Sequence, residues 1–147
     1  RALNEAMLAL PRHYAIAMLD VDHYKKFNDS YGHNKGDDVL RIVGRVMLRY
    51  GGSASVFRYG GEEFTLLFKG RNVEQAEETL EQVREEIQAQ RLDVSTDTKT
   101  KEISVTASLG LAYSAAGDAP GDVIKRADQA LYQAKRKGRN RLMVAAD

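Results

Sequence analysis

The sequence contains no cysteine, which excludes disulfide bonds and thiolate metal sites. It also lacks any apolar run near the ~20 residues that a helix needs to cross a bilayer, and no signal peptide is visible. The formal net charge is +1, so no overall electrostatic field draws the chain towards nucleic acid or a membrane. We therefore expect a cytoplasmic domain, free or as the cytoplasmic part of a membrane-anchored protein, whose own residues contact no membrane.

The length of 147 residues and a hydrophobic content of 43% fit one domain with a single core. Hydrophobic periodicity and turn residues predict the order of elements. The helices are expected at residues 1–10, 24–31, 37–50, 73–91 and 121–137, and the strands at 14–21, 55–58, 63–68, 103–113 and 141–145. This order predicts an α/β fold, an α+β sandwich with a mostly antiparallel sheet, a β-α-α-β-β-α-β core and helices packed on the sheet.

Two adjacent carboxylates, Glu62 and Glu63, directly follow a glycine pair in the stretch RYGGEEF, residues 58–64. Gly60 and Gly61 can adopt the positive φ of a two-residue hairpin turn, and the flanking segments are rich in strand-forming residues. A bulky charged ligand can approach the backbone closely where no side chain is present. The motif indicates a site where metal and phosphate meet, although a plain hairpin turn with solvated glutamates remains an alternative.

A second acidic pair, Asp20 and Asp22, ends the apolar run Tyr14–Leu19, which is typical of a buried strand. A short helix is expected to start directly afterwards, and its free backbone N–H groups favour an anion. The pattern therefore predicts a cation site beside a phosphate site. Capping of the helix by Asp22 is the simpler alternative, but it leaves Asp20 unexplained.

These segments resemble the GGDEF family, the diguanylate cyclases. The signature is GGEEF at residues 60–64, with Glu where many members have Asp. Further blocks that match the family are DVDHYKKFND at 20–29, YGH at 31–33, GD at 36–37, RADQALYQAK at 126–135 and GRNR at 138–141. The matching blocks follow the family order and span almost the whole chain.

The resemblance implies a fold related to adenylyl cyclases and the polymerase palm. It also implies condensation of two GTP into cyclic di-GMP and two pyrophosphates at the interface of a homodimer. Mg²⁺ or Mn²⁺, two ions per active site, would be held by Asp20, the carbonyl of Val21, and Glu63. Glu62 would bind the second ion or help to deprotonate the attacking hydroxyl, so Asp20, Glu62 and Glu63 form the expected catalytic group.

The resemblance also implies which residues bind GTP. Asn28 and Asp37 are assigned to guanine, with Asp37 selecting GTP over ATP, and Lys135 and Arg139 to the β- and γ-phosphates. Further expected substrate-binding residues are His23, Tyr24, Lys25 and Gly61. Simpler roles exist: Asp37 precedes a helical run and could be its N-cap, and cations near a helix C-terminus are favoured by the helix dipole.

Two other functions fit parts of the sequence. One is a catalytically silent GGDEF module that binds GTP and regulates a partner, but the site residues that silent members usually lose are intact here. The other is a nucleic-acid-binding module, suggested by the basic residues 135–141. That segment lacks an aromatic stacking platform, so we expect no nucleic-acid partner.

The chain departs from the family pattern at two places. An amphipathic helix at residues 1–10 has no initiator Met, and the family's usual lead-in is missing. We therefore expect a fragment of a larger protein with an upstream sensor or regulatory domain. The family's Arg-x-x-Asp product-binding motif is replaced by Gly51-Gly52-Ser53-Ala54, which predicts weak feedback inhibition.

Overall fold

The computed structural model describes Leu3 and residues 13–146, so the helix expected at residues 1–10 lies almost entirely outside the described part. The element order is β1 (Tyr14–Val21), α2 (Tyr24–Tyr31), α3 (His33–Tyr50), β2 (Ser55–Gly60), β3 (Glu63–Lys69), the 3-10 helix η1 (Gly70–Gln75), α4 (Ala76–Ala89), β4 (Leu92–Asp93), β5 (Glu102–Ile103), β6 (Ala107–Tyr113), α5 (Pro120–Arg136) and β7 (Leu142–Val144).

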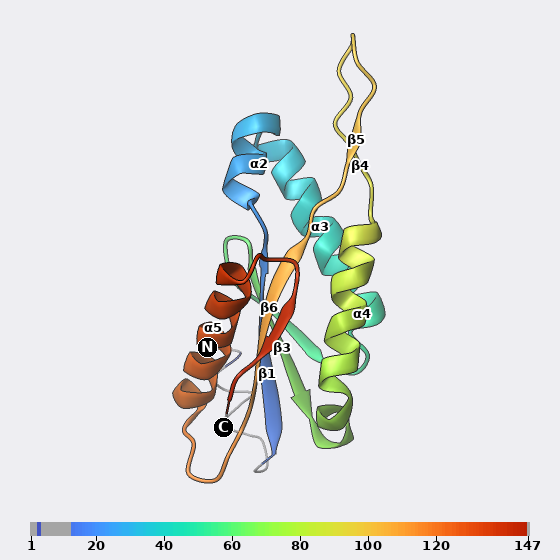
Figure 1. Ribbon diagram of the computed structural model, residues 1–147. Helices are drawn as coiled ribbons and strands as arrows, with labels where there is room; N and C mark the ends of the chain where they lie inside the picture. Colours follow the sequence, from blue (N-terminus) through green and yellow to red (C-terminus); the bar gives the residue numbers. More distant parts are fainter. Residues whose placement is uncertain (1–2, 4–12, 147) are drawn as a thin grey trace.

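A five-stranded sheet with the order β2-β3-β1-β6-β7 forms the centre of the molecule. All neighbouring pairs are antiparallel except β6 and β7, which are parallel. Helices α3 and α4 lie on one side of the sheet and α5 lies on the other (Figure 1). The short strands β4 and β5 form an arm that projects from the body (Figure 1). The α/β fold with a mostly antiparallel sheet is thus confirmed.

Strand β1 is buried along its whole length, and its side chains alternate between the two faces of the sheet. Ala17 and Leu19 pack in the core under α3 and α4, whereas Ile16 and Met18 pack in the smaller core under α5. Continuing this alternation puts Asp20 on the α5 side. A carboxylate at the end of a buried strand is thereby brought next to the last turn of a helix from the far end of the chain.

Most expected elements are confirmed, with three differences. Helix α3 begins at His33 rather than at residue 37, because Gly32 with φ 88° separates it from α2. The expected helix 73–91 divides into η1 and α4. The expected strand 103–113 is interrupted at residues 104–106, where the carbonyl of Thr106 accepts from the N–H of Asp22 instead of joining a strand ladder.

Helix α4 packs one apolar face on the sheet through Leu80, Val83 and Ile87, as its periodicity predicts. Its other face carries glutamates that are mostly exposed. None of the helices in the described part of the chain has both the length and the apolar character required to cross a membrane.

Candidate active site

The GGEEF hairpin places its two carboxylates differently from the expected turn. Gly60 still pairs with Glu63, so the turn residues are Gly61 and Glu62 rather than the glycine pair. Gly61 takes the positive φ, 50°, and its carbonyl accepts from Nε and Nη2 of Arg58 at 3.0 and 2.7 Å. The register shifts between Arg58 and Gly60, which moves the turn by one residue. Glu62 therefore stands at the tip, and Glu63 is the first residue of β3.

Asp20 and Glu63 are direct partners across the antiparallel pair β1–β3. Asp20 is 5% exposed, and its Oδ2 accepts a hydrogen bond from the ammonium of Lys135 on α5. Its other oxygen, Oδ1, is buried and accepts no hydrogen bond from the residues that the structure describes. Burial raises the pKa of Asp20, Lys135 opposes this change, and the negative charges of Glu62 and Asp22 add to it. The arrangement thus leaves a buried acceptor oxygen uncompensated.

The carboxyl group of Glu63 has the same kind of environment. Its pKa is raised first by burial and then by the charges of Asp20 and Asp128, while Lys135 lowers it. The described residues hold no group of three Asp, Glu, His or Cys side chains arranged as a complete metal site. Mg²⁺ does not need one, because it commonly uses one or two carboxylates and completes its shell with water and substrate phosphates. The acidic pair and the free Oδ1 fit a hard divalent cation.

A cleft of about 410 Å³ opens at the end of β1. Its wall gathers eight of the expected site residues from four separate segments: Asp20, Val21, His23, Tyr24, Lys25, Glu62, Lys135 and Arg139. Asp22, Lys26 and Asp29 complete the lining. The expected residues Gly61, Glu63, Asn28 and Asp37 are not part of this wall. The cleft therefore combines carboxylates with lysine and arginine side chains, as a site for a metal-bound phosphate requires.

Asn28 and Asp37 lie on the neighbouring helices α2 and α3. Oδ1 of Asn28 is buried and has no hydrogen-bond donor within the described part of the chain. It lies against Gly36, where an added Cβ would come within 1.7 Å of it, so any other residue at this position would displace the Asn28 side chain. Asp37 is exposed and lies inside α3, whose N-cap is Gly32. The alternative that Asp37 caps the helix is therefore wrong, and its carboxylate is available for a ligand.

The turn after α5 carries Arg139 into the cleft. Gly138, Arg139 and Asn140 all have positive φ, at 121°, 64° and 47°. The N–H of Arg139 donates to the carbonyl of Ala134 at 2.9 Å, which satisfies one of the free carbonyl groups at the helix end. Lys135 precedes this turn on the last turn of α5. Two cations from one helix end thus reach the same cleft.

Asp22 has a role that the sequence did not indicate. It does not cap α2, whose N-cap is His23 with φ 58° and no side-chain hydrogen bond. Its carboxylate instead accepts from Thr106 Oγ1, Ser108 Oγ and the N–H of Asn140 at 2.7, 2.6 and 3.0 Å. The capping alternative is wrong because these partners are distant in sequence. The sequence signal that could have indicated this role is the pair of hydroxyl residues, Thr106 and Ser108, near the start of the apolar strand β6.

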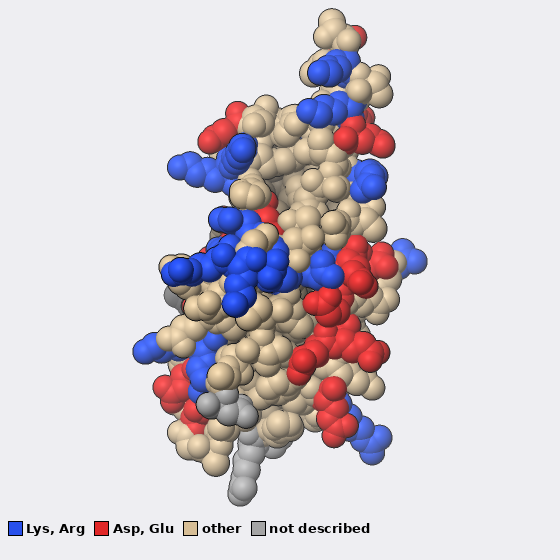
Figure 2. Space-filling model, in the orientation of Figure 1, with Lys and Arg blue, Asp and Glu red and all other residues tan. Residues whose placement is uncertain are grey.

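Charge is distributed unevenly on the surface around the cleft. Figure 2 shows lysine and arginine side chains in a band over the end of α5 and the following turn. Acidic side chains follow α4 beside this band (Figure 2). Lys135 belongs to the last turn of α5 and Arg139 to the turn that follows it, so a polyphosphate at this end of the helix would meet positive potential.

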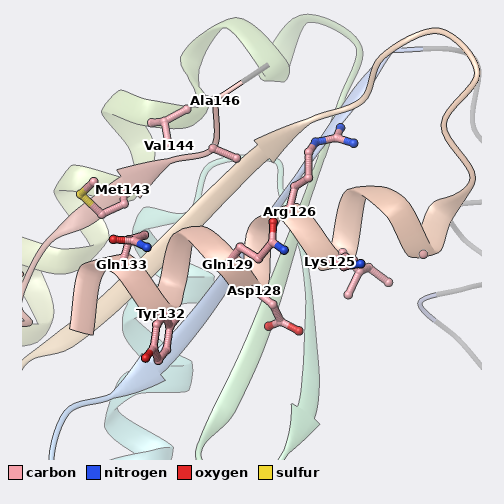
Figure 3. Close-up of a pocket in the computed structure, with 12 residues that line it drawn as sticks. Lys125, Arg126, Asp128, Gln129, Tyr132, Gln133, Met143, Val144 and Ala146 are labelled. Carbon is pink, nitrogen blue, oxygen red and sulfur yellow. The ribbon is translucent and has the colours of Figure 1, made fainter. Parts of the chain in front are cut away.

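A larger groove, of about 930 Å³, lies between α5 and β7. Lys125, Asp128 and Tyr132 line it from the helix, and Met143 and Val144 line it from the strand (Figure 3). The guanidinium of Arg126, which also lines the groove, donates to Asp118 and to the carbonyl of Tyr113. The lining of this groove contains neither the acidic residues of the GGEEF hairpin nor Asp20, so the smaller cleft is the better candidate for chemistry.

The chain is similar in sequence to known proteins. The family model described as "Diguanylate cyclase, GGDEF domain" matches residues 1–141. The chain is 40% identical over 131 residues to diguanylate cyclase DgcP of Pseudomonas aeruginosa, covering 88% of this chain and 19% of that protein. It is 38% identical over 131 residues to diguanylate cyclase VdcA of Vibrio cholerae, covering 88% of this chain and 38% of VdcA. The chain thus spans well under half the length of these relatives.

Solved structures show the same fold. The GGDEF domain of DgcB from Caulobacter crescentus, in complex with c-di-GMP, superimposes with a TM-score of 0.81 at 37% identity, covering 90% of this chain and 77% of that one. The active GGEEF domain of a diguanylate cyclase from Vibrio cholerae superimposes with a TM-score of 0.80 at 28% identity, covering 99% of this chain and 89% of that one. The fold, the GGEEF hairpin and these matches together show that the chain belongs to the GGDEF family.

Proposed function

We propose that this domain is a diguanylate cyclase, which condenses two GTP into cyclic di-GMP and releases two pyrophosphates. One observation carries the proposal: Asp20, whose Oδ1 is buried and accepts no hydrogen bond from the described residues, lines a cleft together with Glu62, Lys135 and Arg139. This combination suits a divalent cation and a polyphosphate side by side. The bacterial relatives named diguanylate cyclases support the same activity.

Asp20, the carbonyl of Val21, and Glu63 are the groups that would hold Mg²⁺ or Mn²⁺. When bound, such ions neutralise negative charge that develops on phosphate oxygens. Glu62 has two candidate roles, to hold a second ion or to accept the proton of the attacking hydroxyl. Its place at the hairpin tip, rather than inside the sheet, is compatible with both.

The cations of the cleft bind the triphosphate in this proposal. Lys135 now compensates Asp20, and its side chain is one-third exposed, at 33%, so it can also face a phosphate. Arg139 presents a planar guanidinium that can bind two phosphate oxygens. Gly61 offers a backbone N–H group that no side chain obstructs. The start of α2 offers further N–H groups, at His23, Tyr24 and Lys25.

The guanine base is assigned to Asn28 and Asp37. Guanine presents N1–H and N2–H₂ donors on one edge, and a carboxylate can accept from both, whereas adenine presents a different pattern. The exposed carboxylate of Asp37 and the unpartnered Oδ1 of Asn28 are both acceptors. Their position on neighbouring helices supports a guanine site next to the triphosphate cleft.

The reaction requires two copies of the domain. The 3′-hydroxyl of one GTP attacks the α-phosphate bound by the other copy, a 3′-O–P bond forms, and the bond to pyrophosphate breaks. A second attack in the opposite direction closes the ring. One domain holding one GTP cannot complete this cycle, so we propose a homodimer whose formation an upstream sensor or regulatory domain controls in the cytoplasm.

Product analysis tests this function directly. The protein is incubated with GTP and Mg²⁺ and the nucleotides are separated, with Asp20→Asn and a metal-free sample as controls. Cyclic di-GMP that forms with the unaltered protein and Mg²⁺, but in neither control, supports the proposal. Bound GTP without product at high protein concentration would instead identify a catalytically silent binding module.

A further inference from the structure

Asp22 is a buried carboxylate that the proposed reaction does not use. It is 6% exposed. Its Oδ1 accepts from Ser108 Oγ at 2.6 Å, and its Oδ2 accepts from Thr106 Oγ1 at 2.7 Å and from the N–H of Asn140 at 3.0 Å. One carboxylate therefore joins the end of β1 to the start of β6 and to the turn after α5.

The turn that Asp22 reaches has a strained backbone. Arg139 and Asn140 are consecutive non-glycine residues with φ values of 64° and 47°. Left-handed backbone costs free energy for such residues, although asparagine tolerates it better than arginine does. A pair of this kind persists only where the surroundings hold it, and such strain is concentrated at functional sites.

Asn140 is held from two sides. Its N–H donates to Asp22, and its side-chain Oδ1 accepts from Nη1 of Arg84 on α4 at 2.9 Å. The side chain of Arg84 is only 17% exposed and also donates to Glu81. The residue directly after Arg139 is thus fixed to both β1 and α4.

This anchoring sets the place of Arg139 in the cleft. Asp22 lies two residues after Asp20, the proposed metal ligand, and Arg139 directly precedes Asn140. We propose that Asp22 is a positioning residue. By accepting from the N–H of Asn140, it keeps the turn in the conformation that presents Arg139 to the β- and γ-phosphates. This inference rests on the proposed binding of GTP.

The test compares the affinities of the protein for GTP and GMP, measured by titration calorimetry with Mg²⁺. In Asp22→Ala the affinity for GTP should fall roughly tenfold, as expected for one weakened charged hydrogen bond. GMP lacks the β- and γ-phosphates, so its affinity should change little. If both affinities fall by the same factor, Asp22 only supports the fold, and the positioning role is overturned.

Two matched variants sharpen the test. Thr106→Val removes one hydrogen bond to the same oxygen and leaves the bond from Asn140, so the GTP-to-GMP affinity ratio should stay unchanged. Asp22→Asn can still accept from Asn140 through its amide oxygen and donate to Ser108, so it should retain most of the ratio. A ratio that falls as far in Asp22→Asn as in Asp22→Ala would assign the effect to the charge and overturn the hydrogen-bond argument.

Arg84→Met decides the question if Asp22→Ala does not fold. It removes the side-chain anchor of Asn140 from a surface helix, so the GTP-to-GMP ratio should fall by a few-fold; an unchanged ratio would overturn the proposal. Failure of the proposed GTP site has a different signature, because the unaltered protein would then bind neither nucleotide. GTP binding that no variant alters would reject only the positioning role.

Discussion

Asp20 and Lys135 lie 115 residues apart in the chain and form an ion pair that joins the end of β1 to the last turn of α5. The pair puts one cation next to Asp20 and Glu63, whose pKa values are raised first by burial and then by neighbouring negative charges. Lys135 therefore compensates only part of the negative charge around Asp20. Several properties of the domain depend on the negative charge that is left uncompensated.

Glu63→Gln should reduce cyclic di-GMP formation by roughly a hundredfold, because it removes a proposed ligand of the metal. The fold should persist, and the melting temperature should stay equal or rise slightly, since a neutral amide relieves the repulsion from Asp20. Product formation and thermal unfolding measure the two effects. The exposed Glu78→Gln on α4 is the control, and near-normal turnover by Glu63→Gln would reject the metal assignment.

Mg²⁺ should raise the melting temperature, and the gain should shrink as the pH falls. The pKa values of Asp20 and Glu63 lie above their ordinary values, which are about 4. Protons therefore compete with the ion at a higher pH than for ordinary carboxylates. Without the ion, stability changes with pH in the opposite direction. Between the pKa of each carboxyl group in the unfolded state and its higher pKa in the folded state, the folded state binds more protons than the unfolded state. A falling pH therefore reduces the destabilisation that Asp20 and Glu63 cause.

Thermal unfolding with and without Mg²⁺ from pH 8 down to about pH 4, where ordinary carboxylates titrate, measures this linkage. Asp20→Asn should lose the gain at every pH. An equal gain in the unaltered protein and in Asp20→Asn would place the ion elsewhere.

Gly36→Ala should weaken GTP binding, because the added Cβ would meet Oδ1 of Asn28 at 1.7 Å and displace it. Gly44→Ala in the same helix is a matched control, since nothing lies within 4 Å of its added Cβ. That control should leave binding unchanged and stabilise the helix by about 0.5–1 kcal/mol. Equal GTP affinity in both variants would remove Asn28 from the guanine site.

Local pattern was sufficient to predict the first strand and the order of the blocks. The apolar run from Tyr14 is long enough to predict β1, and it puts Asp20 at the C-terminal end of that strand. The role of Asp22 was not predictable in this way, because Thr106, Ser108 and Asn140 reach it only after the sheet forms. Sequence spacing does not encode such contacts.

The turn register shows a second limit of local reasoning. Gly60 and Gly61 are equally suited to a turn, but cross-strand pairing of Gly60 with Glu63 selects Gly61 and Glu62. The hydrogen bonds from Arg58 to the carbonyl of Gly61 accompany this choice. Pairing with β3, rather than the glycine pair itself, therefore decides which carboxylate stands at the tip.

Specific activity should rise with protein concentration, since the reaction needs two domains and this chain spans only part of the length of its relatives. Fusion to an unrelated dimeric coiled coil should restore activity in dilute solution, because tethering raises the effective concentration without a new contact at the site. Initial rates over a hundredfold dilution series test this expectation. A constant specific activity would indicate that the chain alone dimerises tightly.

Cyclic di-GMP should bind this domain weakly outside the active site. The family resemblance puts the expected product-binding arginine at the position of Gly51, which is buried at the end of α3. A Cβ there would lie 2.3 Å from the carbonyl oxygen of Met47, so this backbone does not accept an arginine without a shift. Ala54 stands where the aspartate is expected.

The nearby arginines do not replace that motif. Arg58 donates to the carbonyl of Gly61, and Arg49 lies over the ring of Tyr50 at 5.5 Å. Because the bidentate cation and its acceptor are missing, the affinity for cyclic di-GMP at this position should be at least roughly tenfold lower than that of a domain with the Arg-x-x-Asp motif. Titration calorimetry with cyclic di-GMP measures it, and the double variant Asn28→Ala, Asp37→Ala removes active-site binding. Tight binding that survives in the double variant would reveal a separate inhibitory site on this domain.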